Sequence, residues 1–247
     1  MKRKIFFGLI LTSSIILSGS SLTKQIIDDN KKPDVNSGVT NSNENNNNGN
    51  TFVPEDSESI EDSNVNVTPP VDNKKTIFIY LNPSVQTKNF YYGNLGTEAQ
   101  HMQDIAHIMY EELKDIPYIH VDCNTYFKTL SLKEAVAESN SKHRHIHFAL
   151  HSNAGGGSGT EVYTKDSIEF ATKMYNTFLT LGNFNKRGVK VQNTLYETNN
   201  SKAEHTALME FLFHDRKDEA LFLVNNKKTI ANTMVKGLIE FINENYW

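Results

Sequence analysis

Residues 145–163 read HIHFALHSNAGGGSGTEVY, and this stretch decides the fold. A short apolar run, Ile146–Leu150, ends abruptly on polar residues, and a cluster of glycines follows before a second run begins at Thr160. In open α/β sheets, ligands bind at the edge where the strands end. The glycines allow positive φ angles and the close approach of a ligand. We therefore expect His151 and Asn153 to lie at a ligand-binding edge, although a core histidine before an ordinary loop explains the same pattern.

Strand and helix patterns alternate on both sides of this stretch. Runs rich in β-branched and aromatic residues predict strands, and apolar residues at helical spacing predict helices. The predicted strands are 76–81, 118–121, 146–150, 160–163, 187–191, 194–196 and 207–213. The predicted helices begin at 97 and cover 130–139, 165–181, 217–224 and 228–243. This alternation favours a single α/β domain over residues 75–247, with a mostly parallel sheet and helices on both faces.

The first 27 residues have the pattern of an export segment. Lys2, Arg3 and Lys4 precede an apolar run, Ile5–Leu17, and small residues follow this run. The pattern predicts a secretory signal peptide, and the run is short for a membrane span. An uncleaved N-terminal anchor that tethers the protein to the membrane is the alternative. We therefore expect an extracellular or cell-wall-associated protein.

Residues 28–74 have the composition of a disordered linker. Asn, Ser, Asp and Glu dominate this segment, which carries a net charge of −7. Its large apolar residues are too sparse to offset the entropy lost on ordering. The segment 75–247 is nearly neutral, with a net charge of −1, which argues against nucleic acid as a partner. The single cysteine, Cys123, excludes an internal disulfide and a cysteine-built zinc site.

Two glutamates are candidates for chemistry. Glu210 is the one carboxylate within an apolar strand, ALMEFLF at residues 207–213. A buried charge is costly unless it is paired, and a buried carboxyl group with a raised pKa is a suitable general acid or base. A glutamate that faces solvent or pairs with an arginine is the alternative. Glu98 lies in the first turn of a helix that Thr97 begins, where the helix dipole favours a carboxylate with or without a metal.

Together, these motifs resemble the zinc-dependent N-acetylmuramoyl-L-alanine amidases of the type-3 group, which occur in bacterial autolysins and phage endolysins. The most specific motifs are HFALHSNAGGGSGTEVY and TLYETNNSKAEHTALMEFLFHD. The resemblance covers residues 76–243 and implies a twisted sheet of about six strands flanked by helices. It also implies that Glu98 and His151 bind zinc and that Glu210 acts in catalysis.

The histidine that usually supplies the first zinc ligand is absent from the sequence. The first loop of the family usually reads Asp-Pro-Gly-His, whereas this chain has Asn82-Pro83-Ser84-Val85-Gln86. Gln86 lies nearest the missing histidine, and an amide oxygen is a poor substitute for imidazole on zinc. His101, three residues after Glu98 and thus on the same helix face, is a further candidate for the third ligand. An exposed surface histidine is the alternative for that residue.

The function that the resemblance implies is an exported peptidoglycan hydrolase that cleaves the amide between N-acetylmuramic acid and L-alanine of the stem peptide. Zinc would polarise the carbonyl and activate water, Glu210 would transfer the proton, and Asn153 would help to hold the substrate. An amidase-like domain that binds peptidoglycan, or regulates another wall hydrolase without cutting, is one alternative. A secreted metal-dependent peptidase is another, and the motifs count against it. We expect zinc as cofactor, no nucleotide, flavin or haem, no nucleic acid, and a monomer.

Overall fold

The computed structural model describes residues 74–124 and 130–247, so the predictions for residues 1–27 and for nearly all of 28–74 lie outside the described residues. The strands are β1 (Ile77–Pro83), β2 (Ile119–Cys123), β3 (Ile146–Asn153), β4 (Thr160–Thr164), β5 (Lys186–Val191) and β6 (His205–Phe213). They form one six-stranded sheet in the order β2-β1-β3-β6-β4-β5. Every neighbouring pair is parallel except β4 with β6. The predicted single α/β domain with a mostly parallel sheet is confirmed.

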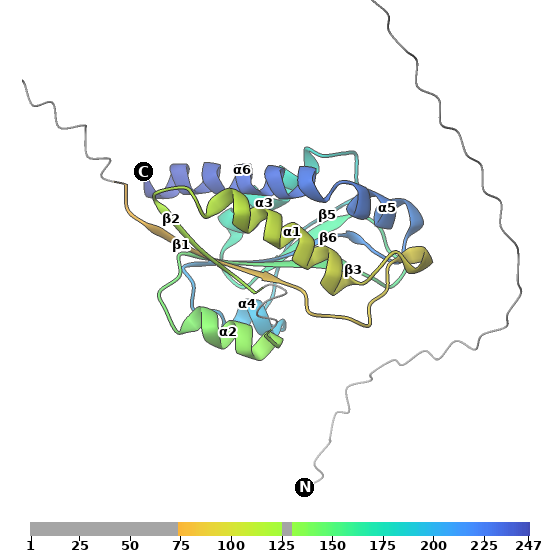
Figure 1. Ribbon diagram of the computed structural model, residues 1–247, viewed down its shortest axis with the longest axis horizontal. Coiled ribbons are helices and arrows are strands. Elements are labelled where there is room, and N and C mark those ends of the chain that lie inside the picture. Colours follow the sequence, from red (N-terminus) through yellow and green to blue (C-terminus); the bar gives the residue numbers. More distant parts are fainter. Residues whose placement is uncertain (1–73, 125–129) are drawn as a thin grey trace, which may run out of the picture. The chain divides into compact units, whose positions relative to one another are not determined.

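Helices cover both faces of this sheet (Figure 1). One face carries α1 (Glu98–Leu113), α3 (Ile168–Leu179) and α6 (Lys227–Tyr246), and the other carries α2 (Leu132–Asn140) and α4 (Tyr196–Asn200). The remaining helices are α5 (Lys217–Asn225), after β6, and a 3-10 turn at Tyr92–Asn94. The apolar core lies between the sheet and the three-helix face, because α1, α3 and α6 each bury one apolar stripe there. Among the described residues, no helix is both long and apolar enough to cross a bilayer.

The start of α1 is fixed locally. The hydroxyl of Thr97 accepts a hydrogen bond from the backbone N–H of Gln100, which satisfies one of the free donors of the first turn. This cap confirms the predicted helix start. Because Glu98 is the first residue of α1, the cap also fixes the position of the Glu98 side chain beside the end of β3.

Near the candidate site, the structure differs from the prediction in the length of one strand and in the type of another element. β3 runs three residues beyond the predicted strand, because it pairs with β6 as far as Asn153. The polar residues His151 and Asn153 therefore belong to a strand and not to a loop. The predicted strand at 194–196 is wrong, since Tyr196 begins the short helix α4. Long-range contacts outweigh local propensity there, because Glu197 in the first turn of α4 is buried against the end of β1.

Candidate active site

Three polar side chains form a row across the edge of the sheet where β3 and β6 end. His151 on β3 is the register partner of Glu210 on β6, and Glu210 is the register partner of Glu161 on β4. Residues at paired positions point to the same face of a sheet. Because β4 runs antiparallel to β6, the beginning of β4 meets the end of β6, and Glu161 joins the row. The edge therefore combines one histidine with two carboxyl groups.

Glu98 faces His151 from the first turn of α1. Oε1 of Glu98 lies 2.9 Å from Nδ1 of His151. Glu98 also accepts hydrogen bonds from Nδ2 of Asn89 at 2.7 Å and from the backbone N–H of Ser152 at 3.4 Å. Burial raises the pKa of Glu98, but the hydrogen bonds from His151 and Asn89 outweigh it and hold the pKa below its usual value. Glu98 is therefore a fixed, ionised carboxylate.

Glu197 is a candidate that the sequence patterns did not reveal. It is buried, and its Oε1 accepts hydrogen bonds from Nδ2 of Asn82 and from Nε2 of His147, the latter at 2.9 Å. Its Oε2 lies 3.7 Å from Nε2 of His151 and has no closer partner among the described residues. Burial raises the pKa of Glu197, but the hydrogen bond from His147 and the positive charge of His151 nearby lower it to about 2. This second carboxylate is therefore also ionised.

His151 thus lies between two carboxylates, with Nδ1 toward Glu98 and Nε2 toward Glu197. Burial lowers the pKa of His151, but the adjacent carboxylates of Glu197 and Glu98 raise it well above its usual value. In the metal-free protein, these two carboxylates favour a proton on each nitrogen of His151. A metal ion at Nδ1 would replace one of these protons, as metal binding to histidine generally does.

Glu210 has the properties of a general acid and base. Oε2 of Glu210 is buried and has no hydrogen-bond partner among the described residues. Burial raises the pKa of Glu210 to about 7, and the negative charges of Glu98 and Glu161 add to this effect, while the positive charge of His151 opposes it. A carboxyl group that titrates near neutral pH can both accept and donate a proton.

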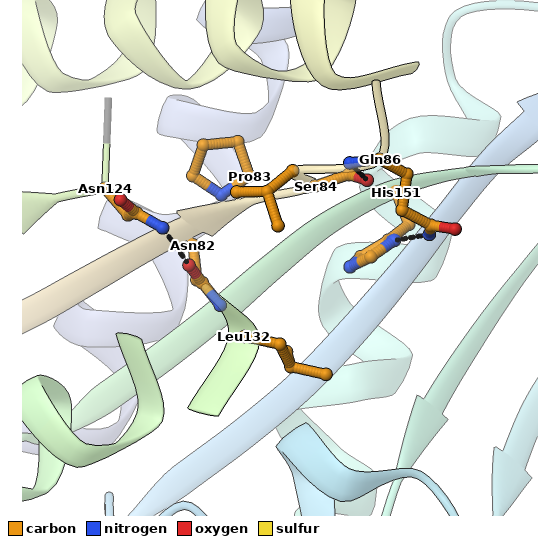
Figure 2. A pocket seen from close by; sticks show the side chains of 8 residues that line it. Asn82, Pro83, Ser84, Gln86, Asn124, Leu132 and His151 are labelled. Atoms are coloured by element: carbon orange, nitrogen blue, oxygen red, sulfur yellow. Dashed lines mark hydrogen bonds between the residues drawn. The ribbon is translucent and has the colours of Figure 1, made fainter. Parts of the chain in front are cut away.

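Gln86 lies beside both Glu98 and His151, in a pocket of about 100 Å³ that Figure 2 shows from close by. Nε2 of Gln86 is 3.5 Å from Oε1 of Glu98 and 3.5 Å from Nδ1 of His151. These spacings are close to the roughly 3.3 Å between neighbouring ligand atoms of a tetrahedral zinc ion with bonds of about 2.0 Å. However, Asn89 donates a 2.9 Å hydrogen bond to Oε1 of Gln86, so the NH₂ group faces the other two residues. Gln86 binds a cation only if its amide reverses, because an NH₂ group has no free lone pair.

The residues present fit zinc with two strong ligands and one weak one. Glu98 and His151 are the usual carboxylate and imidazole ligands, and each is oriented by further hydrogen bonds. The amide oxygen of Gln86 would complete three protein ligands and leave a fourth position open, as catalytic zinc requires.

His101 does not join this cluster. Its Nε2 lies 2.7 Å from the carbonyl oxygen of Leu95, and its ring packs against Tyr91 with the ring centroids 4.4 Å apart. His101 is buried and not exposed. The spacing of three residues places it near the helix face of Glu98, but its side chain turns toward the loop before α1. The structure therefore does not bring together the three-ligand set of Glu98, His101 and His151.

Asn153 lies on β3 two residues after His151. Its Nδ2 donates a hydrogen bond to Oε1 of Glu161 at 2.5 Å. Glu161 also forms ion pairs with Arg187 and Lys190 on β5, and hydrogen bonds from Lys190 and Arg187 outweigh the effect of burial and lower its pKa. Asn153 is thus held between the strand end and a charged cluster, beside Glu210.

The glycine-rich turn adopts the backbone conformations that its sequence predicts. Gly155 and Gly156 have φ angles of 103° and 76°, which side-chain-bearing residues rarely adopt. Their backbone N–H groups donate hydrogen bonds of 2.7 and 2.8 Å to Oδ2 of Asp215. At Gly157, a Cβ atom would lie 2.4 Å from the ring of Phe213. The turn is therefore closely packed against the end of β6.

A second group of potential metal ligands lies at the other end of β3. Candidate ligand atoms of His143, His145 and Glu204 all lie within 4.8 Å of one another. However, Nδ1 of His145 accepts a 3.0 Å hydrogen bond from the backbone N–H of Phe78, so the neutral ring carries its proton on Nε2. The nitrogen that faces Glu204 therefore has no lone pair for a metal ion.

The sequence matches the profile of a known protein family. The profile of the N-acetylmuramoyl-L-alanine amidase family matches residues 81–240. The chain belongs to this family. It is therefore a hydrolase of the peptidoglycan amidase class, and the suspected family and enzyme class are confirmed.

Solved structures of amidases have the same fold. The N-acetylmuramoyl-L-alanine amidase of Clostridium difficile 630 aligns with a TM-score of 0.62 at 18% identity, over 69% of this chain and 99% of its own. The catalytic domain of the amidase CwlV from Bacillus (Paenibacillus) polymyxa var. colistinus aligns with a TM-score of 0.62 at 18% identity, over 68% and 99%. The catalytic domain of the CD27L endolysin targeting Clostridia difficile aligns with a TM-score of 0.54 at 21% identity, over 67% and 97%. No curated protein sequence matches the chain.

Proposed function

We propose that this chain is an exported, zinc-dependent amidase that cleaves the bond between N-acetylmuramic acid and L-alanine of the stem peptide. The observation that carries the proposal is the 2.9 Å contact of Glu98 with Nδ1 of His151, next to Glu210, whose Oε2 has no hydrogen-bond partner in the described part of the chain. Metal-assisted hydrolysis of an amide requires metal ligands and a proton-transfer group at one place. The family membership of the chain supports the same substrate, peptidoglycan.

In this proposal five residues of the site have roles. Glu98 and His151 would hold a zinc ion, with the amide oxygen of Gln86 as a weak third ligand. When bound there, zinc would supply Lewis-acid chemistry toward the scissile carbonyl and a water molecule. Glu210 takes a proton from the attacking water and passes it to the leaving nitrogen, for which a pKa of about 7 is suitable. Asn153 contacts the substrate at the same edge.

The N-terminal residues extend the proposal to the location of the protein. The basic start and apolar run of residues 1–27 support a signal peptide or an anchor, and residues 28–74 support a polar linker. The amidase domain, residues 75–247, would then act outside the membrane or within the wall as a monomer. Deletion of 28–74 is expected to leave the thermal unfolding midpoint of the domain unchanged.

One observation favours a second candidate function. Asn89 orients the amide of Gln86 so that an NH₂ group faces Glu98 and His151. The NH₂ group of Gln86 donates a hydrogen bond to the carboxylate of Glu98 and thus partly takes the place of a metal cation there. If this arrangement persists in the presence of zinc, the chain is an amidase-like domain that binds peptidoglycan or regulates another wall hydrolase without cutting.

The two candidates differ in metal content and in product. The purified full-length chain is equilibrated with zinc, freed of excess metal, and incubated with purified sacculi. The amidase proposal predicts about one zinc ion per chain, new free amino groups on L-alanine, and loss of both after chelation. Sedimentation of the chain with sacculi without any new amino groups would instead establish the binding function.

A further inference from the structure

We propose that Glu197 is a positioning residue that makes His151 a metal ligand through Nδ1. The inference rests on the proposed zinc-dependent function and concerns a residue that no motif of the sequence marks. Its basis is the arrangement of carboxylates around the His151 ring.

The two carboxylates lie on different sides of the ring. Glu98 contacts Nδ1 at 2.9 Å, whereas Oε2 of Glu197 lies 3.7 Å from Nε2. The two nitrogens of an imidazole point away from each other, so one metal ion cannot bind one of them and reach both carboxylates. Since Gln86 also lies on the Nδ1 side, Glu197 is excluded as the replacement for the missing histidine ligand.

Glu197 has instead the contacts of a group that orients a ligand. A histidine that binds metal usually donates its other N–H to a carboxylate, which fixes the ring and makes it a stronger ligand. Oε2 of Glu197 lies 3.7 Å from Nε2 of His151 and has no hydrogen bond among the residues described, so it is available to this N–H once the ring moves closer on binding metal. A proton on Nε2 leaves the lone pair of Nδ1 for zinc, on the side where Glu98 and Gln86 lie.

Glu197 is itself held rigidly. Its Oε1 accepts hydrogen bonds from Asn82 and from Nε2 of His147, and Nδ1 of His147 contacts Oγ of Ser139 at 2.9 Å. These contacts join the ends of β1 and α2 to the start of β3. The helix α4 that carries Glu197 has five residues, so these tertiary contacts fix the side chain more than the helix does.

The weak third ligand makes this positioning more important. With an amide in place of an imidazole, Glu98 and His151 supply most of the affinity for zinc. Any loss of orientation or ligand strength at His151 is then expressed directly in the zinc dissociation constant.

The first test compares two Glu→Gln substitutions in the full-length chain. Glu197→Gln keeps the shape but provides a single acceptor oxygen for the N–H groups of Asn82, His147 and His151. Glu204→Gln makes the same change beside His145, at the other end of β3, and serves as the matched control. Zinc affinity is measured by competition with a chromophoric chelator, and the thermal unfolding of each metal-free variant shows whether it folds.

We expect Glu197→Gln to raise the zinc dissociation constant about 10- to 100-fold and Glu204→Gln to change it less than about twofold. Equal zinc affinity of wild type and a folded Glu197→Gln variant would overturn the inference and leave the amidase proposal intact. A wild-type chain that binds no zinc would overturn both.

A second measurement needs no variant and decides the case in which Glu197→Gln does not fold. The ¹⁵N shifts of His151 in the zinc-loaded wild-type chain report which nitrogen carries the metal and which the proton. The inference requires zinc on Nδ1 and a proton on Nε2. Zinc on Nε2 would show that Glu197 does not have this role.

Discussion

The two ends of β3 carry similar residues that differ in what they can bind. At the amino end, His145 lies near Glu204, and at the carboxyl end, His151 lies between Glu98 and Glu197. The amino-end cluster also includes His143, and its candidate ligand atoms all lie within 4.8 Å of one another. The direction of one hydrogen bond argues against this cluster as a metal site, because the backbone N–H of Phe78 occupies Nδ1 of His145.

This difference teaches that a histidine is selected as a ligand by the partner of its second nitrogen. A carboxylate at that nitrogen favours an N–H there and leaves the lone pair of the other nitrogen for metal, the role proposed for Glu197 at His151. A backbone N–H donates a hydrogen bond to that nitrogen and so places the proton of the neutral ring on the nitrogen that faces the cluster. Both clusters combine histidine with glutamate, but the direction of the hydrogen bond at the second nitrogen differs between them.

The largest expected effect is on catalysis and concerns Glu210, a group that the amino-end cluster lacks. Glu210→Gln should lower the rate of sacculus cleavage by about 10³-fold or more, because it removes the group that transfers the proton. Zinc content should stay near that of wild type. Glu204→Gln, the control, should keep near-wild-type cleavage. Release of new amino groups from sacculi measures both, and near-wild-type cleavage by Glu210→Gln would exclude Glu210 as the proton-transfer group.

The next effect is on metal content. His151→Ala should remove most of the bound zinc, because Glu98 and the amide of Gln86 alone hold zinc poorly. His145→Ala should keep its zinc and instead lose about 1–3 kcal/mol of unfolding free energy, since the N–H of Phe78 loses its buried acceptor. Atomic absorption and chemical denaturation measure the two quantities. Zinc loss in His145→Ala alone would transfer the metal site to the amino end.

A smaller gain is expected from repairing the carboxyl-end cluster. Gln86→His should lower the zinc dissociation constant by about tenfold or more, because imidazole replaces a weakly binding amide. Gln86→Ala should raise it less than His151→Ala does. His101→Ala is the control: it should leave zinc affinity unchanged and lower stability, because His101 is buried against Tyr91. A zinc affinity that falls with His101→Ala as far as with His151→Ala would restore His101 as a ligand.

The smallest effect is on the pH dependence of stability in the metal-free chain. The folded-state pKa of Glu210 is raised to about 7, so its contribution is fully present below the unfolded pKa near 4.5 and is lost as the pH rises through 7. The difference in unfolding free energy between wild type and Glu210→Gln should therefore fall by about 1–3 kcal/mol over this range.

The contribution of Glu204 to the unfolding free energy should change with pH in the direction opposite to that of Glu210. Burial raises the pKa of Glu204, but the hydrogen bond from Tyr246 and the positive charge of Lys75 help to lower it overall. Its contribution is present above the unfolded pKa and is lost as the pH falls through the folded pKa. Urea unfolding at a series of pH values compares the two glutamates, and equal signs would contradict the difference between them.

Most of the fold follows from the sequence, because the strands and helices that bury one face repeat their apolar residues at regular spacing. The end of β3 and the nature of residues 194–196 did not follow. In both places, pairing with a distant strand or burial of a single side chain outweighs local pattern.

The candidate site is predictable only in part. Glu210 is visible because a charge interrupts an apolar strand, and His151 because a strand ends at a glycine-rich turn. Glu197 has no such context in YETNN, and only the fold brings it to Nε2 of His151. Glu98 and His101 have the predicted i,i+3 spacing on α1, but the side chain of His101 forms a hydrogen bond with the carbonyl oxygen of Leu95 in the preceding loop and does not face the site.

The position of β6 between β3 and β4 has a consequence for the order in which the protein folds. β3 and β4 follow each other closely in the chain, but they are not paired with each other, because β6 lies between them. Until β6 inserts, both strands present open edges, which are sites for aggregation. The same insertion delivers Glu210, so a nascent or truncated chain that lacks β6 has no counterpart of the proposed proton-transfer group. An amidase built in this way would gain its cutting activity only after nearly the whole domain has been made.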